Sequence, residues 1–227
     1  LSSLAGYAFE ENEQELYVNL YTGGILDTVK GGKKNRLVIE TEYPWKGQVK
    51  IQVENQEDTA FTLALRIPGW CSGYVLKVNG ENAEKKTDKG YVLLERTWKN
   101  GDEISLEMDM PVQILEANPR VREDIGKVAV TRGPVVYCLE EADNGDQLQE
   151  IYLKEEPEFK TKYEPDLLKG VVTIEAKGKR VSRKGWEKES LYRTYTGKKF
   201  EDADLKFIPY YAWTNRTPGE MTVWVRV

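Results

Sequence analysis

Histidine is absent from this chain, so any chemistry would rest on carboxylates, Lys, Tyr, Ser, Thr and two cysteines. Histidine is the usual general base near neutral pH and the commonest metal ligand in proteins. Among 38 Asp and Glu residues, pairs at a catalytic-looking spacing arise by chance, as in EDADLKF from Glu201 and EMDM from Glu107. Such a pair needs a cleft, and no local pattern indicates one. These carboxylates are therefore predicted to lie on the surface or in turns.

The two cysteines, Cys71 and Cys138, show neither zinc-knuckle nor redox-pair spacing. A nucleophilic cysteine needs a base or a metal that stabilises its thiolate. Cys71 follows Trp70 after a turn and has only Arg66 as a basic neighbour, whereas Cys138 lies in an apolar run. Both are predicted to be structural thiols that are buried and free, with a disulfide between them as the alternative.

The stretch IPYYAWTNR, at residues 208–216, combines aromatic rings with an amide and a guanidinium. If it continues as a strand, Tyr210 faces the core, whereas Tyr211 and Trp213 lie on the opposite face. Exposed rings could stack on sugars while the two polar side chains bind hydroxyls, or they could pack beneath another domain. With the YPW motif and a tryptophan near the C-terminus, the candidates for carbohydrate or interdomain contact are Tyr43, Trp45, Tyr211, Trp213, Asn215, Arg216 and Trp224.

Strands are expected to position these residues, because apolar and polar residues alternate with a period of two along most of the chain. Leu37 and Ile39 share a face in this pattern, as do Phe61 and Leu63. About seven such segments precede Pro111, enough to close one β-sandwich of roughly 100 residues. Further strands follow the irregular segment after this proline.

The predicted fold class is all-β, with two antiparallel, jelly-roll-like β-sandwiches at residues 9–111 and 112–227. Apolar residues at helical spacing in residues 1–8 predict the tail of a helix before the first sandwich. The first residues show neither an initiator Met nor a signal peptide, so we expect the sequence to be cut from something longer. The sequence indicates no cellular compartment.

The formal charge of −5 predicts no general binding of nucleic acid, and no apolar run is long enough to span a bilayer. Neither nucleic acid nor a membrane is expected as a partner. Residues 177–199 carry nine Lys and Arg against two Glu, a local charge of +7. A solvated loop facing an acidic neighbour is the simpler interpretation of this stretch, and a protein-partner role stays open.

A series of segments resembles, in order, the C-terminal region of glycoside hydrolase family 127. The segments are ELYVNLYTGG, TEYPWKGQVKIQV, LALRIPGWC, GYVLLERTWKNGDEISLEMDMPV, ANPRVREDIGKVAVTRGPVVYCLE and FIPYYAWTNRTPGEMTVWV. The resemblance spans nearly the whole chain and is weakest between residues 153 and 204. The blocks GPVVYCLE and IPYYAWTNR are its most specific parts.

This resemblance implies a retaining β-L-arabinofuranosidase whose catalysis lies in an N-terminal α/α barrel, braced by β-sandwich domains. In the family, a zinc-bound cysteine thiolate is the nucleophile and a glutamate is the acid/base. Zinc would hold such a thiol deprotonated. The ligand cysteines occur in a CCPPN-like stretch just upstream of the helix ending in SLAGY, and this sequence begins at LSSLAGY. No catalytic or metal position is therefore carried over, and zinc is expected only in the barrel.

The resulting prediction is a non-catalytic portion that braces its own barrel, acts on no substrate by itself and holds no cofactor. One alternative is a carbohydrate-binding module, in which the aromatic candidates grip an arabinose-containing glycan. A second alternative is a structural or adhesive surface sandwich. Rings that are exposed and coplanar along a groove would favour the carbohydrate-binding module. Rings that are buried against the first helix and the other sandwich would favour bracing.

Overall fold

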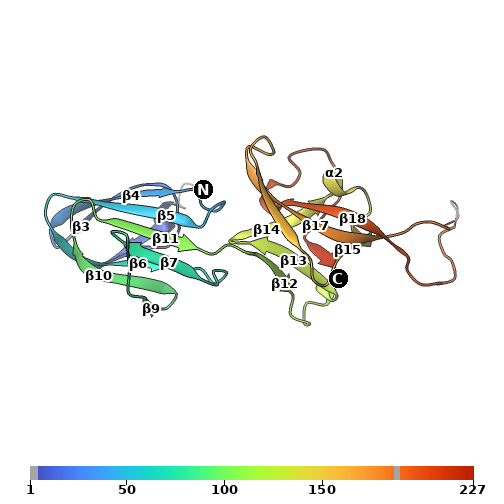
Figure 1. Ribbon diagram of the computed structural model, residues 1–227, viewed down its shortest axis with the longest axis horizontal. Coiled ribbons are helices and arrows are strands. Elements are labelled where there is room, and N and C mark those ends of the chain that lie inside the picture. Colours follow the sequence, from blue (N-terminus) through green and yellow to red (C-terminus); the bar gives the residue numbers. More distant parts are fainter. Residues whose placement is uncertain (1–4, 187–189) are drawn as a thin grey trace. The chain divides into compact units, whose positions relative to one another are not determined.

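The computed structural model describes residues 5–186 and 190–227 of the 227-residue chain. The chain divides into two compact units, residues 1–111 and 112–227 (Figure 1), and each is described by itself. Helix α1 (Ala5–Ala8) opens the described part and is followed at once by a strand. The rest of the helix tail predicted for residues 1–8 lies outside the described residues.

The described part of unit 1 forms two sheets that face each other across one core. The burial of alternate residues shows this arrangement, as at Leu37 and Ile39 in one sheet and Phe61 and Leu63 in the other. The first sheet has the order β1 (Phe9–Glu11), β2 (Glu15–Val18), β6 (Thr59–Arg66), β10 (Tyr91–Trp98) and β9 (Lys86–Asp88). The second has the order β3 (Gly24–Lys30), β4 (Lys33–Thr41), β5 (Gln48–Asn55), β11 (Glu103–Met108), β7 (Tyr74–Val78) and β8 (Glu81–Asn82).

Trp98 is the largest fully buried side chain of this core. Its indole N–H donates a hydrogen bond to the carbonyl of Phe61 at 3.0 Å, and the two rings lie 5.9 Å apart between centroids. Burying a large apolar side chain stabilises a fold by roughly 1.5–3 kcal/mol, and the hydrogen bond removes the cost of a buried donor. Trp98 therefore fixes the end of β10 against β6.

Unit 2 is built from one nine-stranded sheet in its described part. Its strands are β12 (Val112–Glu116), β13 (Lys127–Arg132), β14 (Val135–Glu140), β15 (Ile151–Leu153), β16 (Phe159–Glu164), β17 (Val171–Val181), β18 (Phe200–Pro209), β19 (Met221–Thr222) and β20 (Trp224–Arg226). Short helical turns are η1 (Arg122–Asp124), α2 (Glu141–Asn144), η2 (Leu148–Glu150) and η3 (Tyr210–Ala212). The pairing β13-β20-β15-β17-β18-β14 returns to β13, so the sheet closes on itself.

The all-β prediction is confirmed, but the topology differs from two antiparallel sandwiches. Unit 2 is a closed sheet, and two strand pairs, β2–β6 and β15–β20, are parallel. Parallel neighbours need a long connection, which the segments between these strands supply. The C-terminal run EMTVWVRV is also not one strand, because Val223 separates β19 from β20.

Candidate functional site

The IPYYAWTNR stretch leaves the sheet at Pro209 and forms the helical turn η3 instead of continuing as a strand. Trp213 N donates to Tyr210 O at 3.1 Å, a bond that brings residues three apart to the same side. Tyr210 and Trp213 consequently stack, with an interplanar angle of 9° and centroids 6.4 Å apart. The prediction that Tyr210 faces the core is wrong: Ala212 is buried, and Tyr210 is 44% exposed. We call residues 210–213 the aromatic turn.

Tyr211 and Trp213, the two rings predicted to lie off the core, are exposed in this turn. Tyr211 is 64% exposed and Trp213 is 38% exposed. Tyr and Trp rings expose large apolar areas at a low cost in conformational freedom, which makes them frequent anchors of binding surfaces. The aromatic turn is therefore the strongest candidate site for a contact with another molecule or domain.

Arg216 holds the aromatic turn against the end of β14. Its Nε donates to the buried carboxylate of Glu140 at 3.0 Å, and its Nη1 and Nη2 donate to Asp143 at 3.1 and 2.6 Å. The hydrogen bond to Asp143, followed by that to Glu140, raises the pKa of Arg216. The second Glu140 oxygen accepts the backbone N–H of Thr214 at 3.0 Å. One buried carboxylate thus binds both the guanidinium and the backbone of the segment after the turn.

Asn215 is the second polar candidate, and its side-chain amide also points back into the turn. Its Nδ2 donates to Ala212 O at 3.0 Å and to Trp213 O at 3.2 Å. The preceding Thr214 has φ of +62°, a left-handed conformation that is unusual for a residue other than Gly, Asn or Asp. Asn215 and Arg216 therefore shape the turn instead of extending toward an external ligand.

Tyr137 and Cys138 lie beneath this region, in β14. Burial raises the pKa of Cys138 to about 12 and that of Tyr137 to about 12. The Tyr137 hydroxyl has no hydrogen-bond partner among the described residues. Cys138 is a buried free thiol, as predicted, whereas Cys71 is only half-buried and donates to Gly73 O at 3.1 Å. Burial likewise raises the pKa of Cys71, so neither thiol is activated as a nucleophile.

The YPW motif lies in unit 1, between β4 and β5. Tyr43 packs against the core of unit 1, with its ring 6.0 Å from that of Tyr21 and 6.3 Å from that of Trp70. Trp45 is half-buried, and its backbone N–H donates to Glu42 O at 2.8 Å. Tyr43 therefore contributes to internal packing. The motif and the aromatic turn belong to different units.

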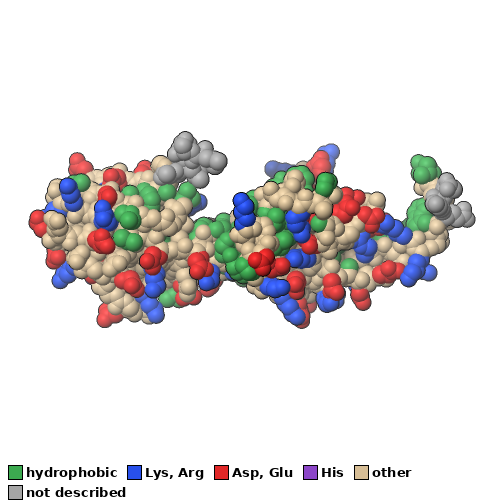
Figure 2. Space-filling model, turned by 90° about the horizontal axis from the view of Figure 1, so that it is seen from above, with side chains coloured by type: hydrophobic (Ala, Val, Ile, Leu, Met, Phe, Trp, Pro, Cys, Tyr) green, Lys and Arg blue, Asp and Glu red, His purple; other side chains and the backbone are tan. Residues whose placement is uncertain are grey.

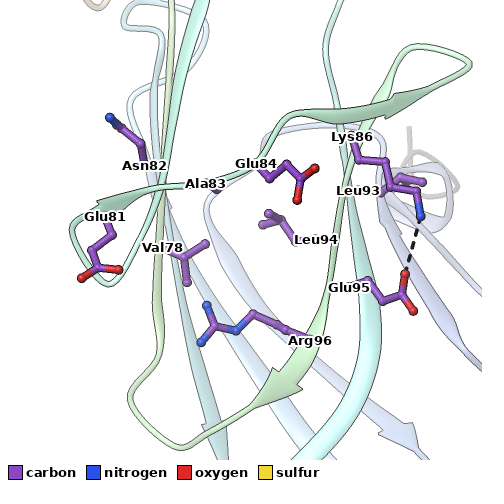
Figure 3. A pocket seen from close by; sticks show the side chains of 10 residues that line it. All are labelled: Val78, Glu81, Asn82, Ala83, Glu84, Lys86, Leu93, Leu94, Glu95 and Arg96. Atoms are coloured by element: carbon purple, nitrogen blue, oxygen red, sulfur yellow. Dashed lines mark ion pairs between the residues drawn. The ribbon is translucent and has the colours of Figure 1, made fainter.

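A hollow of about 540 Å³ in unit 1 was not predicted by the sequence (Figure 3). It lies between the β7–β8 edge of one sheet and the β9–β10 edge of the other, and Figure 3 shows Glu84 and Arg96 near Leu94. The ammonium of Lys86 lies 3.6 Å from the Glu95 carboxylate on its wall. No aromatic ring lines this hollow, so it lacks a stacking surface for sugars.

Charged side chains of both signs are interspersed over the face shown in Figure 2. The basic stretch at 177–199 begins inside β17 and is not a loop throughout. Arg183 binds Asp146 and Glu150 at 3.1 and 2.8 Å, and Lys184 binds Glu201 at 2.9 Å. Acidic neighbours thus neutralise part of the stretch. Residues 187–189 lie outside the described residues.

Within residues 5–186 and 190–227, no cluster of three or more His, Cys, Asp or Glu residues could hold a metal ion. No helix of the described part is long and apolar enough to cross a membrane.

These features define a protein of two consecutive β domains, the second of which presents an exposed aromatic turn. Residues 15–110 match the family model of the "Beta-L-arabinofuranosidase, GH127 middle domain". Residues 112–226 match that of the "Glycoside hydrolase family 127 C-terminal domain". The chain belongs to glycoside hydrolase family 127.

Similar proteins include a non-reducing end β-L-arabinofuranosidase of Bifidobacterium longum subsp. longum, 37% identical over 193 residues, which are 82% of this chain and 29% of that protein. A solved GH127 β-L-arabinofuranosidase of Geobacillus stearothermophilus T6 is 41% identical, with a TM-score of 0.94, over 99% of this chain and 35% of its own. A second solved GH127 β-arabinofuranosidase is 35% identical, with a TM-score of 0.89, over 99% of this chain and 37% of its own. The chain thus spans about a third of these relatives.

Proposed function

We propose that the chain is the non-catalytic part of a GH127 β-L-arabinofuranosidase and that it braces the catalytic α/α barrel of that enzyme. Both units belong to this family, and the matched relatives are about three times as long as the chain. The remaining two thirds of such an enzyme would carry the nucleophile, the acid/base and zinc. The partner of this chain is then its own barrel.

The observation that carries the proposal is the construction of the aromatic turn. Arg216 and Asn215, which could have bound sugar hydroxyls, donate to Glu140, Asp143 and the backbone of the turn. Tyr210 and Trp213 stay exposed above this framework. A sugar site combines an aromatic surface with convergent polar groups, whereas a protein contact needs a fixed apolar anchor. The aromatic turn therefore has the character of a protein contact.

The thiols of the chain support a non-catalytic role. A nucleophilic thiol needs a depressed pKa, and burial shifts those of Cys71 and Cys138 in the opposite direction. The proposal therefore expects no hydrolysis by the chain itself. A structural or adhesive role without a barrel would share this expectation but would give the aromatic turn no partner.

The purified chain tests the catalytic part of the proposal directly. Incubated with zinc, a thiol and an aryl β-L-arabinofuranoside, it is expected to release no more aryl alcohol than a heat-killed control. Turnover above that control would overturn the non-catalytic assignment. Titration with neutral arabino-oligosaccharides tests the alternative of a carbohydrate-binding module at the turn. Saturable binding that Trp213→Ala abolishes would favour that alternative.

A further inference from the structure

Trp224 lies on the outer face of the closed sheet of unit 2, in β20. Val225 points into the core, so its neighbours Trp224 and Arg226 point outward. Across the ladder Arg226 pairs with Lys127 of β13 on one side and with Tyr152 of β15 on the other. Three adjacent strands thus place two cations and two aromatic rings on one surface.

Lys127, Trp224 and Arg226 of this surface line a hollow of about 340 Å³, which lies entirely within unit 2. Leu148 and Ile151, both buried, contribute apolar lining, and Gln149 and Thr222 add an amide and a hydroxyl. Ligand pockets in proteins measure roughly 300–1,000 Å³, so the hollow has room for a small ligand. Its lining combines apolar and hydrogen-bonding groups.

The charge of the hollow is the feature that selects a ligand. Lys127 donates to the backbone oxygen of Glu123 at 2.6 Å, and Arg226 donates to the hydroxyl of Tyr152 at 3.1 Å. Neither cation forms an ion pair with a carboxylate in the part of the chain that the structure describes. Glu220 is the one acidic residue of the lining, and its carboxylate accepts the backbone N–H of Leu148 at 2.8 Å. The hollow is therefore net positive.

The donors of both cations are only partly used. An ammonium has three N–H donors and a guanidinium has five, so Lys127 and Arg226 retain several for a ligand. A carboxylate accepts such charge-assisted hydrogen bonds most strongly, and the half-buried Trp224 ring offers a surface on which the apolar face of a sugar can stack. One ligand class supplies both a carboxylate and a sugar ring.

We infer that this hollow binds a saccharide that carries a carboxylate, such as a uronic acid residue, on Trp224, Lys127 and Arg226. The site goes beyond bracing, because its lining includes no residue of the aromatic turn and it needs no partner domain. It would hold an acidic glycan on the chain while any hydrolysis takes place elsewhere.

The test uses the intact 227-residue chain, a galacturonic acid disaccharide and neutral arabinobiose as the uncharged comparison. Calorimetry is expected to show saturable binding of the uronate at millimolar concentration or below, weaker at high salt, with much weaker binding of arabinobiose. Lys127→Gln and Arg226→Gln are each expected to weaken uronate binding roughly tenfold, because each removes one charge-assisted contact. Lys50→Gln, at an exposed position in unit 1, is the matched control and should bind as the parent chain does.

Trp224→Ala could disturb β20, so Trp224→Phe, which keeps a ring, accompanies it, and circular dichroism checks the fold of every variant. No uronate binding at millimolar concentration would overturn the inference. Equal affinity for arabinobiose would overturn the role of the carboxylate, and full affinity in both cation variants would overturn the location. These outcomes concern ligand binding by the chain alone, so they stay distinct from any failure of the bracing proposal.

Discussion

The guanidinium of Arg216 binds the carboxylate of Glu140 across 76 residues of sequence, with Nε 3.0 Å from Oε2. The Glu140 side chain is only 5% exposed and the Arg216 side chain 20%. This pair joins the two sequence blocks, GPVVYCLE and IPYYAWTNR, that most specifically resemble the family. The exposed rings of the aromatic turn depend on it for their position.

Arg216→Met should lower the free energy of unfolding of unit 2 by roughly 2–4 kcal/mol, because it leaves the buried charge of Glu140 without its cation. Urea unfolding measures this loss. Adding Glu140→Gln should recover part of it, since the unpaired charge is then removed. Arg36→Met breaks an exposed pair with Asp27 and serves as the control, with an expected cost of about 0–1 kcal/mol. Equal costs for Arg216→Met and Arg36→Met would contradict the role assigned to the buried pair.

Tyr137→Phe should leave stability unchanged or raise it by about 1 kcal/mol. The hydroxyl that it removes is buried without a hydrogen-bond partner among the described residues, and such a group costs free energy in the folded state. Trp98→Phe is the matched comparison, because it loses a buried hydrogen bond to Phe61 and should destabilise unit 1. A clear loss of stability in Tyr137→Phe would show that the hydroxyl has a partner in solution.

Alkaline pH should destabilise unit 2 through Cys138. Its pKa in the folded chain is about 12, against an ordinary value near 9, so the neutral thiol contributes stability below pH 9. That contribution is lost as the pH rises through 9 toward 12, because the unfolded thiol ionises first. Linkage gives a fall of about 2 kcal/mol between about pH 8.5 and about pH 10.5 for this group alone.

Urea midpoints at the two pH values, compared between the parent chain and Cys138→Ala, isolate that contribution from the titration of other groups. The parent chain should lose more stability than the variant does over this interval. The same pH dependence in both chains would mean that the thiol is solvated in the folded state.

The strands of unit 1 could be predicted because their core has a simple period. Leu37, Ile39, Phe61 and Leu63 alternate with polar residues, and each is buried as this pattern predicts. Burial on one face of a strand is a local property of the sequence. Family membership could be predicted from the order of longer segments, and the family comparisons confirm it.

The aromatic turn could not be predicted, because its cause is distant in the sequence. Period two places Tyr210 in the core, but the chain turns after Pro209, and the residues that hold the turn include Glu140 on another strand. The closed sheet of unit 2 and the parallel pairs likewise depend on long-range pairing. Such contacts leave no mark in the local alternation of residues. The charged hollow around Trp224 was missed for the same reason, since Lys127 meets Arg226 only across the ladder.

If the chain braces the barrel, Trp213 anchors the contact with the barrel. The isolated chain does not need this contact. Trp213→Ala should change the stability of the chain itself by no more than about 1 kcal/mol, because the ring is partly exposed and its truncation leaves no buried polar group. In a larger enzyme the same truncation should weaken the attachment of the barrel by more than about 1 kcal/mol, as hot-spot truncations do.

A chimera measures the effect of Trp213 on the attachment of the barrel most directly. In it, this chain replaces the matching third of the Geobacillus stearothermophilus T6 enzyme. The parent chimera keeps Trp213, a second chimera carries Trp213→Ala, and a third carries Lys50→Gln as the control. The half-life of arabinofuranosidase activity at one elevated temperature is then compared among them. We predict that Trp213→Ala shortens this half-life roughly tenfold, whereas Lys50→Gln leaves it unchanged. Equal half-lives for Trp213→Ala and the parent chimera would contradict the claim that the aromatic turn braces the catalytic domain.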